Sequence, residues 1–236
     1  VTMGCGQFCT NPGLIIGQRS AAFSAFVEQL KAQMTDQPAQ TMLNRGTLAS
    51  YRKGLEHLHG HPGIRHLAGT AQGEGQAQPQ LFAADVRLLL EGDGLLQEEV
   101  FGPATVVVEV EDPTQLRAAL QALRGQLTAT LIGETQELLA NAWLGELLQD
   151  KVGRVLVNGY PTGVEVCDAM VHGGPYPATS DSRGTSVGSL AIERFLRPVC
   201  FQNYPDELLP AALRDGNPLG VMRLVDGVFG QDVITN

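Results

Sequence analysis

The middle of the chain constrains the fold most, because it alternates between strand-like and helix-like patterns. Apolar runs rich in β-branched residues at 105–110, 127–132 and 155–157 are separated by helical patterns at 113–123 and 135–149. Strands joined by helices of this length pair in parallel, and the helices cover the faces of the sheet. The sequence therefore predicts an α/β fold, with a mainly parallel sheet and helices on both faces.

Local patterns also predict the elements before this region. We expect a buried strand at 14–17, an amphipathic helix at 20–34 with Phe23, Phe26, Val27 and Leu30 inward, a weaker helix at 41–57, a loop at 69–80 and a strand at 81–90. Asp112 can cap the helix that follows it, with Pro113 in the first helical position and Gln115 in the capping-box position.

The last third of the chain is less regular. Residues 159–184 are rich in Gly and Pro and predict a long loop, and loops of this length are usually functional or disordered. The further expected elements are helices at 186–196 and 206–214 and a strand at 199–202. Inward positions are Leu138, Leu139, Ala142 and Leu147 in the helix at 135–149, and Val187, Leu190, Ala191 and Phe195 in the helix at 186–196. No internal repeat and no clean linker marks a domain boundary.

Composition excludes several classes of protein. The net charge is −9 and no Lys/Arg cluster stands out, so we expect no nucleic-acid partner and no anionic membrane partner. No apolar run reaches transmembrane length, and the N-terminus lacks a signal pattern. Four cysteines in 236 residues are no disulfide framework, so reduced thiols and a cytoplasmic location are expected.

The thiol of Cys9 is the leading candidate for chemistry. It stands between Gly-Gln-Phe and Thr-Asn-Pro, a composition that suits a turn, ahead of the apolar run at 14–16. A thiol becomes a nucleophile as its thiolate, which needs exposure and polar N–H neighbours. The alternative is a buried free cysteine that packs as a small hydrophobe.

Two motifs together resemble the aldehyde dehydrogenase superfamily. Gly-Gln-Phe-Cys at residues 6–9 is followed, at about the family's spacing, by Glu-Glu-Val-Phe-Gly-Pro at 98–103. Longer stretches at 6–13, 172–179, 181–183, 192–198, 217–220 and 223–227 resemble the α-ketoglutarate semialdehyde (2,5-dioxovalerate) dehydrogenases in particular. The related long-chain fatty aldehyde dehydrogenases are the nearest alternative.

The resemblance implies a domain assignment. Residues 1–236 would form the catalytic domain with a C-terminal tail, and a dinucleotide-binding domain would precede residue 1 in the whole enzyme. The chain alone is then expected to lack turnover. Members of the family are dimers or tetramers, which implies a homo-oligomer.

The resemblance also implies a mechanism. The Cys9 thiolate would attack the aldehyde carbon, and the Cys9 backbone N–H and an Asn side chain would hold the oxyanion. Hydride would pass to NAD or NADP, and a carboxylate would activate the water that hydrolyses the thioester. By the family pattern, that Asn and that carboxylate lie upstream of residue 1.

The same resemblance assigns cofactor and substrate positions. Glu99 matches the carboxylate that accepts from the nicotinamide ribose hydroxyls, and Phe101 matches an aromatic residue near the nicotinamide. Their alternatives are a surface carboxylate and ordinary core packing. Phe8 and Asn158 are implied to line the substrate pocket. Arg183 is the candidate partner for the carboxylate of the semialdehyde, and its alternative is to pin the loop.

The sequence also permits two other functional interpretations. One is a non-catalytic truncated module, and another is a thiol hydrolase that uses Cys9 with His172, provided that the imidazole reaches the thiol. His57, His59, His61 and His66 lie close together, but their spacing matches no common zinc signature, so we expect no metal. Cys5 is expected to be structural, and Cys167 and Cys200 are expected to be buried.

Overall fold

The computed structural model describes residues 1–69 and 75–235, so the loop expected at 69–80 lies partly outside the described residues. The chain divides into two compact units, Val1–Arg194 and Phe195–Asn236. The first unit carries the motifs at 6–13, 98–103 and 172–179, and it therefore holds the candidate site.

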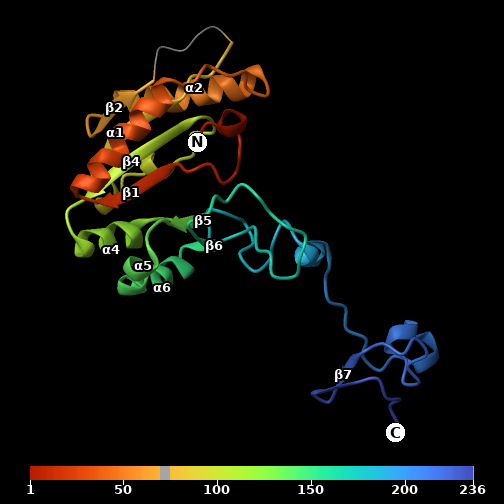
Figure 1. Ribbon diagram of the computed structural model, residues 1–236. Coiled ribbons are helices and arrows are strands. Elements are labelled where there is room, and N and C mark those ends of the chain that lie inside the picture. Colours follow the sequence, from red (N-terminus) through yellow and green to blue (C-terminus); the bar gives the residue numbers. More distant parts are fainter. Residues whose placement is uncertain (70–74, 236) are drawn as a thin grey trace. The chain divides into compact units, whose positions relative to one another are not determined.

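A four-stranded sheet forms the centre of the first unit (Figure 1). Its order is β1 (Leu14–Gln18), β4 (Ala104–Val110), β3 (Gln80–Ala84) and β2 (Ile64–Ala68). β1 and β3 run parallel to β4, and β2 runs antiparallel to β3. β1 is half-buried rather than buried as expected, because it lies at the edge of this sheet.

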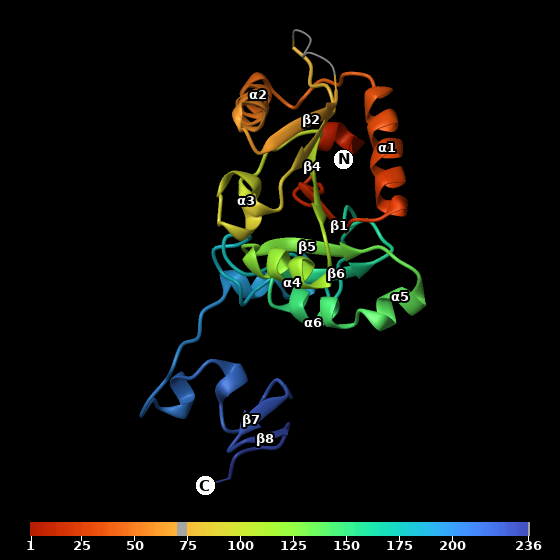
Figure 2. The same ribbon diagram turned by 90° about the vertical axis from the view of Figure 1, so that its left-hand side faces the viewer.

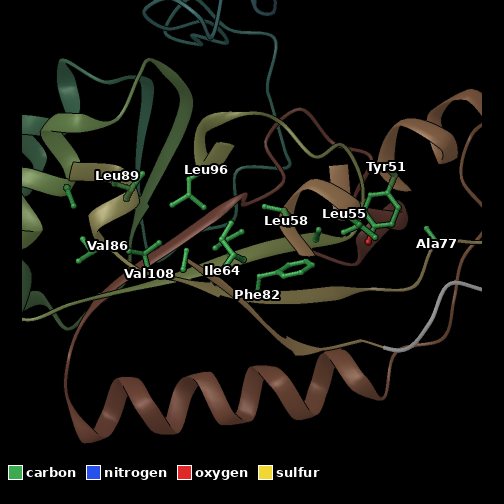
Figure 3. Close-up of a cluster of buried hydrophobic side chains, with 14 of the residues drawn as sticks. Tyr51, Leu55, Leu58, Ile64, Ala77, Phe82, Val86, Leu89, Leu96 and Val108 are labelled. Atoms are coloured by element: carbon green, nitrogen blue, oxygen red, sulfur yellow. The ribbon is translucent and has the colours of Figure 1, made fainter. Parts of the chain in front are cut away.

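Alternation along β4 directs apolar side chains to both faces of the sheet. Val106, Val108 and Val110 join the larger core cluster, which includes residues of α2 (Arg45–Gly60), as Figure 3 shows in part. Val107 joins a second cluster with α1 (Ala21–Thr35). Figure 2 shows α1 and α2 on opposite sides of the strands. A sheet between helices is thus confirmed, as the valine-rich run predicts.

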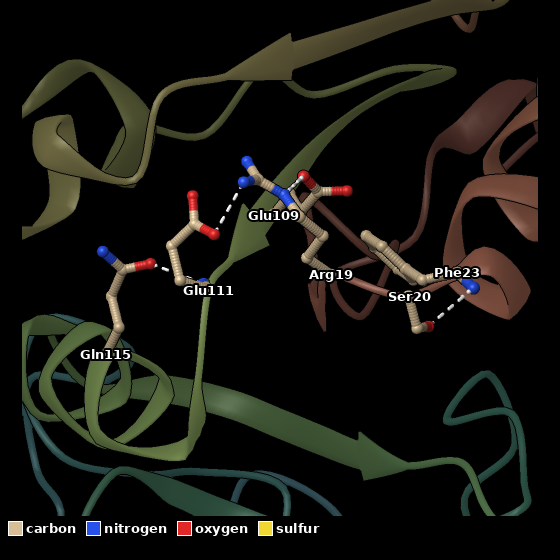
Figure 4. A network of polar contacts seen from close by, with 6 residues as sticks. All are labelled: Arg19, Ser20, Phe23, Glu109, Glu111 and Gln115. Atoms are coloured by element: carbon tan, nitrogen blue, oxygen red, sulfur yellow. Dashed lines mark hydrogen bonds and ion pairs between the residues drawn. The ribbon is translucent and has the colours of Figure 1, made fainter.

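Side-chain caps fix where the helices begin. Ser20 Oγ accepts from the N–H of Phe23, and Asp112 accepts from the N–H of Gln115 at the start of α4 (Pro113–Ala122). The predicted start of α4 is confirmed, but the Gln115 side chain accepts from the N–H of Glu111, one residue before the cap (Figure 4). Arg19 bridges the end of β1 to the end of β4 through Glu109 and Glu111, each at 2.6 Å (Figure 4).

A second, parallel sheet consists of β5 (Gln126–Leu131) and β6 (Val152–Val157). The single helix expected between them is two helices, α5 (Thr135–Ala140) and α6 (Trp143–Gln149). Asn141 breaks it, because its side-chain amide donates to the Glu137 carbonyl and accepts from the indole of Trp143. The expectation of inward side chains at 139 and 142 is wrong, since both residues are exposed.

Two further expectations in the first unit need correction. Phe26 of α1 is exposed, whereas Phe23, Val27 and Leu30 pack on the sheet as expected. The strand expected at 81–90 ends after Ala84, because the Asp85 carboxylate accepts from the N–H of Arg87 and turns the chain into α3 (Arg87–Leu90).

The end of the chain departs most from expectation. The helix at 186–196 is only a 3-10 helix, η3 (Ser189–Phe195), because Gly188 adopts a left-handed φ of 97°, and the inward positions expected at 190 and 195 are exposed. The helix expected at 206–214 is two 3-10 turns, since Pro210 cannot continue a helix. No strand forms at 199–202. Instead β7 (Arg223–Val225) and β8 (Val228–Gly230) form an antiparallel hairpin.

Adjacent leucines of α3 provide a test of this core. Leu89 is 0% exposed and Leu90 is 40% exposed. We expect Leu89→Ala to lower the free energy of unfolding by about 2–4 kcal/mol, because it leaves a cavity in the larger cluster. Leu90→Ala serves as the matched control and should cost less than about 1 kcal/mol. Urea unfolding of both variants checks this, and equal losses would contradict the burial of Leu89 and the exposure of Leu90 in α3.

Candidate functional site

The Cys9 turn is shaped by a left-handed stretch before it. Gly4, Cys5 and Gly6 have φ values of 56°, 58° and 64°, which only glycine adopts without strain. They form η1 (Met3–Gly6), after which the chain turns through Cys9 into β1. Cys9 is exposed, so the interpretation as a buried hydrophobe is wrong, while its neighbour Thr10 is buried.

Close backbone packing joins this turn to the second motif. A side chain on Gly6 would overlap the carbonyl group of Gly102 and the nitrogen of Pro103. The Asn11 side chain also donates to the Gly102 carbonyl at 3.0 Å. Two motifs that lie about ninety residues apart in the sequence are therefore in direct contact.

Tyr51 of α2 supports this contact from the core. Its ring lies against Gly102 and leaves no room for a side chain there. Its hydroxyl donates to the carbonyls of Gln78, at 2.9 Å, and Pro103, at 3.4 Å. Nothing in the local sequence pattern marks Tyr51, which only the tertiary structure brings to the motif.

An imidazole faces the thiol. His172 Nε2 lies 3.2 Å from Cys9 Sγ, within hydrogen-bond distance for sulfur. The backbone of His172 is fixed on both sides, since its N–H donates to Thr185 Oγ1 and its carbonyl accepts from Ser186. Burial and the nearby charge of Arg154 both lower the pKa of His172, so that the imidazole is neutral at pH 7. A neutral imidazole can accept the thiol proton.

The long loop touches the turn at a second point. The Thr10 hydroxyl donates to the Pro161 carbonyl at 3.3 Å. Residues 159–184 therefore approach Cys9 from the carboxyl end of β6, through Pro161 and through His172. From the sequence, His172 is a candidate only as the partner of Cys9 in a hydrolase. The signal available for it was its place in the His-Gly-Gly-Pro run at 172–175.

Glu99 and Phe101, the residues expected to bind the cofactor, lie just before Gly102 and Pro103 in the sequence. Glu98 and Glu99 are exposed, and within the described residues the Glu99 carboxylate has no hydrogen-bond partner. Phe101 is half-buried and adjoins Gly102. An acceptor-only carboxylate that is free and exposed fits a partner that offers hydroxyl donors.

The three expected substrate positions lie in different surroundings. The half-buried ring of Phe8 packs on Gly4. The Asn158 side chain makes two hydrogen bonds with the backbone of Gly133, which tie the ends of β5 and β6 together. The side chain of Arg183 is 90% exposed and pairs with Asp181 at 3.2 Å. In residues 1–69 and 75–235, no hydrogen bond or ion pair joins Asn158 or Arg183 to Cys9.

The remaining cysteines and histidines divide between core and surface. Cys5 is buried, as its structural assignment requires, and burial raises the pKa of its thiol. Both Cys167 and Cys200 were expected to be buried, but Cys167 is half-buried and Cys200 is exposed. The rings of His59 and His66 lie 4.9 Å apart, and His61 pairs with Asp93. Across the described residues, no group of three or more potential ligands is placed to hold a metal ion.

We expect Gly6→Ala to destabilise the protein by about 2–5 kcal/mol, because it adds both a strained φ and an overlap with the Gly102 backbone. Gly13→Ala is the matched control in the same motif, since Gly13 has an ordinary φ and nothing within 4 Å of the added carbon. Thermal or urea unfolding measures the difference. A similar small loss of unfolding free energy in both variants would show that the backbones of Gly6 and Gly102 are not in close contact.

Comparisons with known proteins identify relatives of this chain by sequence. No protein-family model matches it. It is 56% identical, over 98% of its length, to an α-ketoglutaric semialdehyde dehydrogenase of Acinetobacter baylyi, and 46% identical, over 96%, to α-ketoglutaric semialdehyde dehydrogenase 2 of Azospirillum brasilense. The chain spans only 44% and 43% of the lengths of these relatives.

The fold agrees with the sequence comparison. An aldehyde dehydrogenase from Bacillus cereus, solved in complex with NAD+, superposes with a TM-score of 0.63 at 18% identity, covering 82% of this chain and 39% of that one. Among the helices of the described residues, none has the length and apolar character that crossing a membrane requires. By its sequence similarity over nearly its whole length, this chain belongs to the aldehyde dehydrogenase superfamily.

Proposed function

We propose that this chain is the thiol-bearing part of an NAD- or NADP-dependent enzyme that oxidises α-ketoglutarate semialdehyde to 2-oxoglutarate. The observation that carries the proposal is the packing of the Cys9 turn directly on Gly102 and Pro103. It supports the proposal because Cys9 is exposed and its turn contacts the motif at 98–103, to which the family resemblance assigns a role at the nicotinamide. Identity of 56% and 46% to two semialdehyde dehydrogenases supports the substrate.

The proposed chemistry starts at the Cys9 thiol. His172 Nε2, at 3.2 Å, accepts the thiol proton, and the thiolate attacks the aldehyde carbon to form a C–S bond. The Cys9 backbone N–H has no acceptor among the described residues, so it is free to stabilise the resulting oxyanion. Loss of hydride from the former aldehyde carbon leaves a thioester, and water then cleaves its C–S bond, which releases the carboxylate product and the Cys9 thiol.

A dinucleotide would be held in part by this chain. The exposed Glu99 carboxylate suits the nicotinamide ribose hydroxyls, and the half-buried Phe101 ring suits the edge of the nicotinamide site. When bound, the cofactor accepts the hydride from the carbon attached to Cys9. The phosphate-binding domain and the water-activating carboxylate belong, in this proposal, to a segment that precedes residue 1. The chain alone is therefore expected to lack turnover.

Arg183, Asn158 and Phe8 are the residues that we assign to the substrate. Arg183 is exposed and could meet the substrate carboxylate only by exchanging its present partner, Asp181. Asn158 shapes the end of β6 through its hydrogen bonds to Gly133. Phe8 adjoins Cys9 in sequence. The long-chain fatty aldehyde dehydrogenases remain the alternative within the superfamily, since they would need no partner for a second carboxylate.

A thiol hydrolase is the second candidate, and the contact between Cys9 and His172 favours it. This contact meets the condition that such an enzyme requires. In a catalytic triad, however, a third group orients the base. Here His172 Nδ1 is buried and has no hydrogen-bond partner among the described residues. The dehydrogenase is therefore the better supported of the two.

The experiment compares this chain with the same chain preceded by the upstream segment of the Acinetobacter baylyi relative. Formation of NADH or NADPH is followed with α-ketoglutarate semialdehyde and with a long-chain aldehyde. We expect turnover of the semialdehyde by the extended chain only, and a loss of at least about 10³-fold in Cys9→Ala, because the nucleophile is removed.

The controls separate the alternatives. Cys200→Ala is the matched variant, because it removes another exposed thiol and should leave turnover unchanged. Turnover restricted to the long-chain aldehyde would overturn the substrate. Hydrolysis of an activated thioester by the chain alone, without cofactor and dependent on both Cys9 and His172, would favour the hydrolase. An active Cys9→Ala variant would refute both candidates.

We also propose that the protein forms a homo-oligomer in the cytoplasm. In the second unit, the β7–β8 hairpin exposes Leu224, Val228 and Phe229, and a two-stranded sheet with bare edges is seldom stable alone. Multi-angle light scattering at micromolar concentration should give a mass of at least a dimer. Phe229→Asp should lower that mass. A monomer throughout would contradict the proposal.

A further inference from the structure

The side chain of Arg154, in β6, donates hydrogen bonds to two backbone carbonyls of the loop at 159–184. Its Nη2 donates to the Pro161 carbonyl at 2.6 Å, and its Nη1 donates to the Gly163 carbonyl at 2.8 Å. Nη1 also lies 3.8 Å from the sulfur of Met170. One half-buried guanidinium therefore contacts both ends of the segment that runs from Pro161 to Met170.

The Pro161 carbonyl connects Arg154 to the Cys9 turn. The same oxygen accepts from Arg154 Nη2 and from the hydroxyl of Thr10, the residue after Cys9. Thr10 is buried, so its side chain has few other positions. The turn and β6 thus meet at a single oxygen atom.

Gly153, the residue of β6 before Arg154, packs against the part of the loop that carries His172. A side chain on Gly153 would overlap the carbonyl group of Gly173, so the strand and the loop are in backbone contact there. His172 immediately precedes Gly173 and follows Met170 by two residues. Residues 153 and 154 together therefore locate His172.

We propose that Arg154 is a positioning residue that holds the loop of His172 against the turn of Cys9. The proposal rests on the proposed role of Cys9 as nucleophile and extends it to a residue that does not touch the thiol. A lysine could not replace it fully, because one ammonium group cannot span the two carbonyls as the guanidinium fork does.

The charge of Arg154 influences the protonation state of His172, while its hydrogen bonds fix the loop that carries this residue. The groups that face His172 are the Cys9 thiol, the Thr185 hydroxyl at its backbone, and the Arg154 guanidinium on β6. The positive charge disfavours the imidazolium and contributes to the lowered pKa of His172. At pH 7 the imidazole is then held close to the thiol in the form that accepts its proton.

The test measures the rate at which iodoacetamide alkylates Cys9 at pH 7, by mass spectrometry of its peptide in the unextended chain. The variants are Arg154→Gln, Arg154→Lys, His172→Asn and the double variant Arg154→Gln/His172→Asn. Arg65→Gln, an exposed arginine of β2, is the matched control. Cys200 in the second unit reports general reactivity in the same sample, and circular dichroism checks folding.

We expect His172→Asn and Arg154→Gln each to slow alkylation of Cys9 by about five- to tenfold, because the imidazole is then absent or no longer held at the thiol and less thiolate forms. In Arg154→Gln this loss of position outweighs the higher basicity that His172 gains when the positive charge is removed. The double variant should be no slower than His172→Asn, since Arg154 acts through His172. Arg154→Lys should fall between wild type and Arg154→Gln, and it carries the test if Arg154→Gln does not fold. Arg65→Gln and the rate at Cys200 should not change.

An NMR titration of His172 supplies a readout that a merely structural role would not move. The pKa of His172 should rise in Arg154→Gln and stay near the wild-type value in Arg154→Lys, which keeps the charge. A Cys9 rate that is unchanged or faster in either single variant, or effects that multiply in the double variant, would overturn the proposal. None of these results depends on aldehyde oxidation, so they are distinguishable from a failure of the proposed function.

Discussion

The close approach of Gly6 to Gly102 and Pro103 is the contact on which the site depends. Backbone meets backbone there, so neither glycine tolerates a side chain, and the left-handed φ of Gly6 sets the direction in which the chain enters the Cys9 turn. Tyr51 supports the other side of Gly102. The position of the thiol is therefore determined by the core of the four-stranded sheet rather than by the turn alone.

The second half of the site comes from a different sheet. β6 ends where the loop 159–184 begins, and this loop returns to the Cys9 turn through the Pro161 carbonyl and the His172 imidazole. The thiol stands between the two parts and remains exposed. Such an arrangement sets an exposed thiol beside an imidazole and near the motif at 98–103, which supports the role proposed for Cys9.

Local physics explains which expectations were confirmed. β-branched runs gave β4 and β5, and the caps at Ser20 and Asp112 fixed two helix starts, because each signal acts within a few residues. Expectations failed where a side chain competes with regular backbone bonding, as at Asn141, or where spacing suggested a core that the fold does not supply, as at Phe195. Periodicity shows that a face could be buried, but not that a partner covers it.

The sequence by itself determined the α/β class, the thiol at Cys9 and the family, because residue patterns and short motifs are carried by neighbouring residues. Only the tertiary structure decided that Gly6 meets Gly102 and that His172 faces Cys9 across 163 positions of sequence. It also showed that Asn158 and Arg183 are engaged elsewhere, with Gly133 and Asp181. Such contacts depend on how separate elements pack, and no local preference encodes the distance between them.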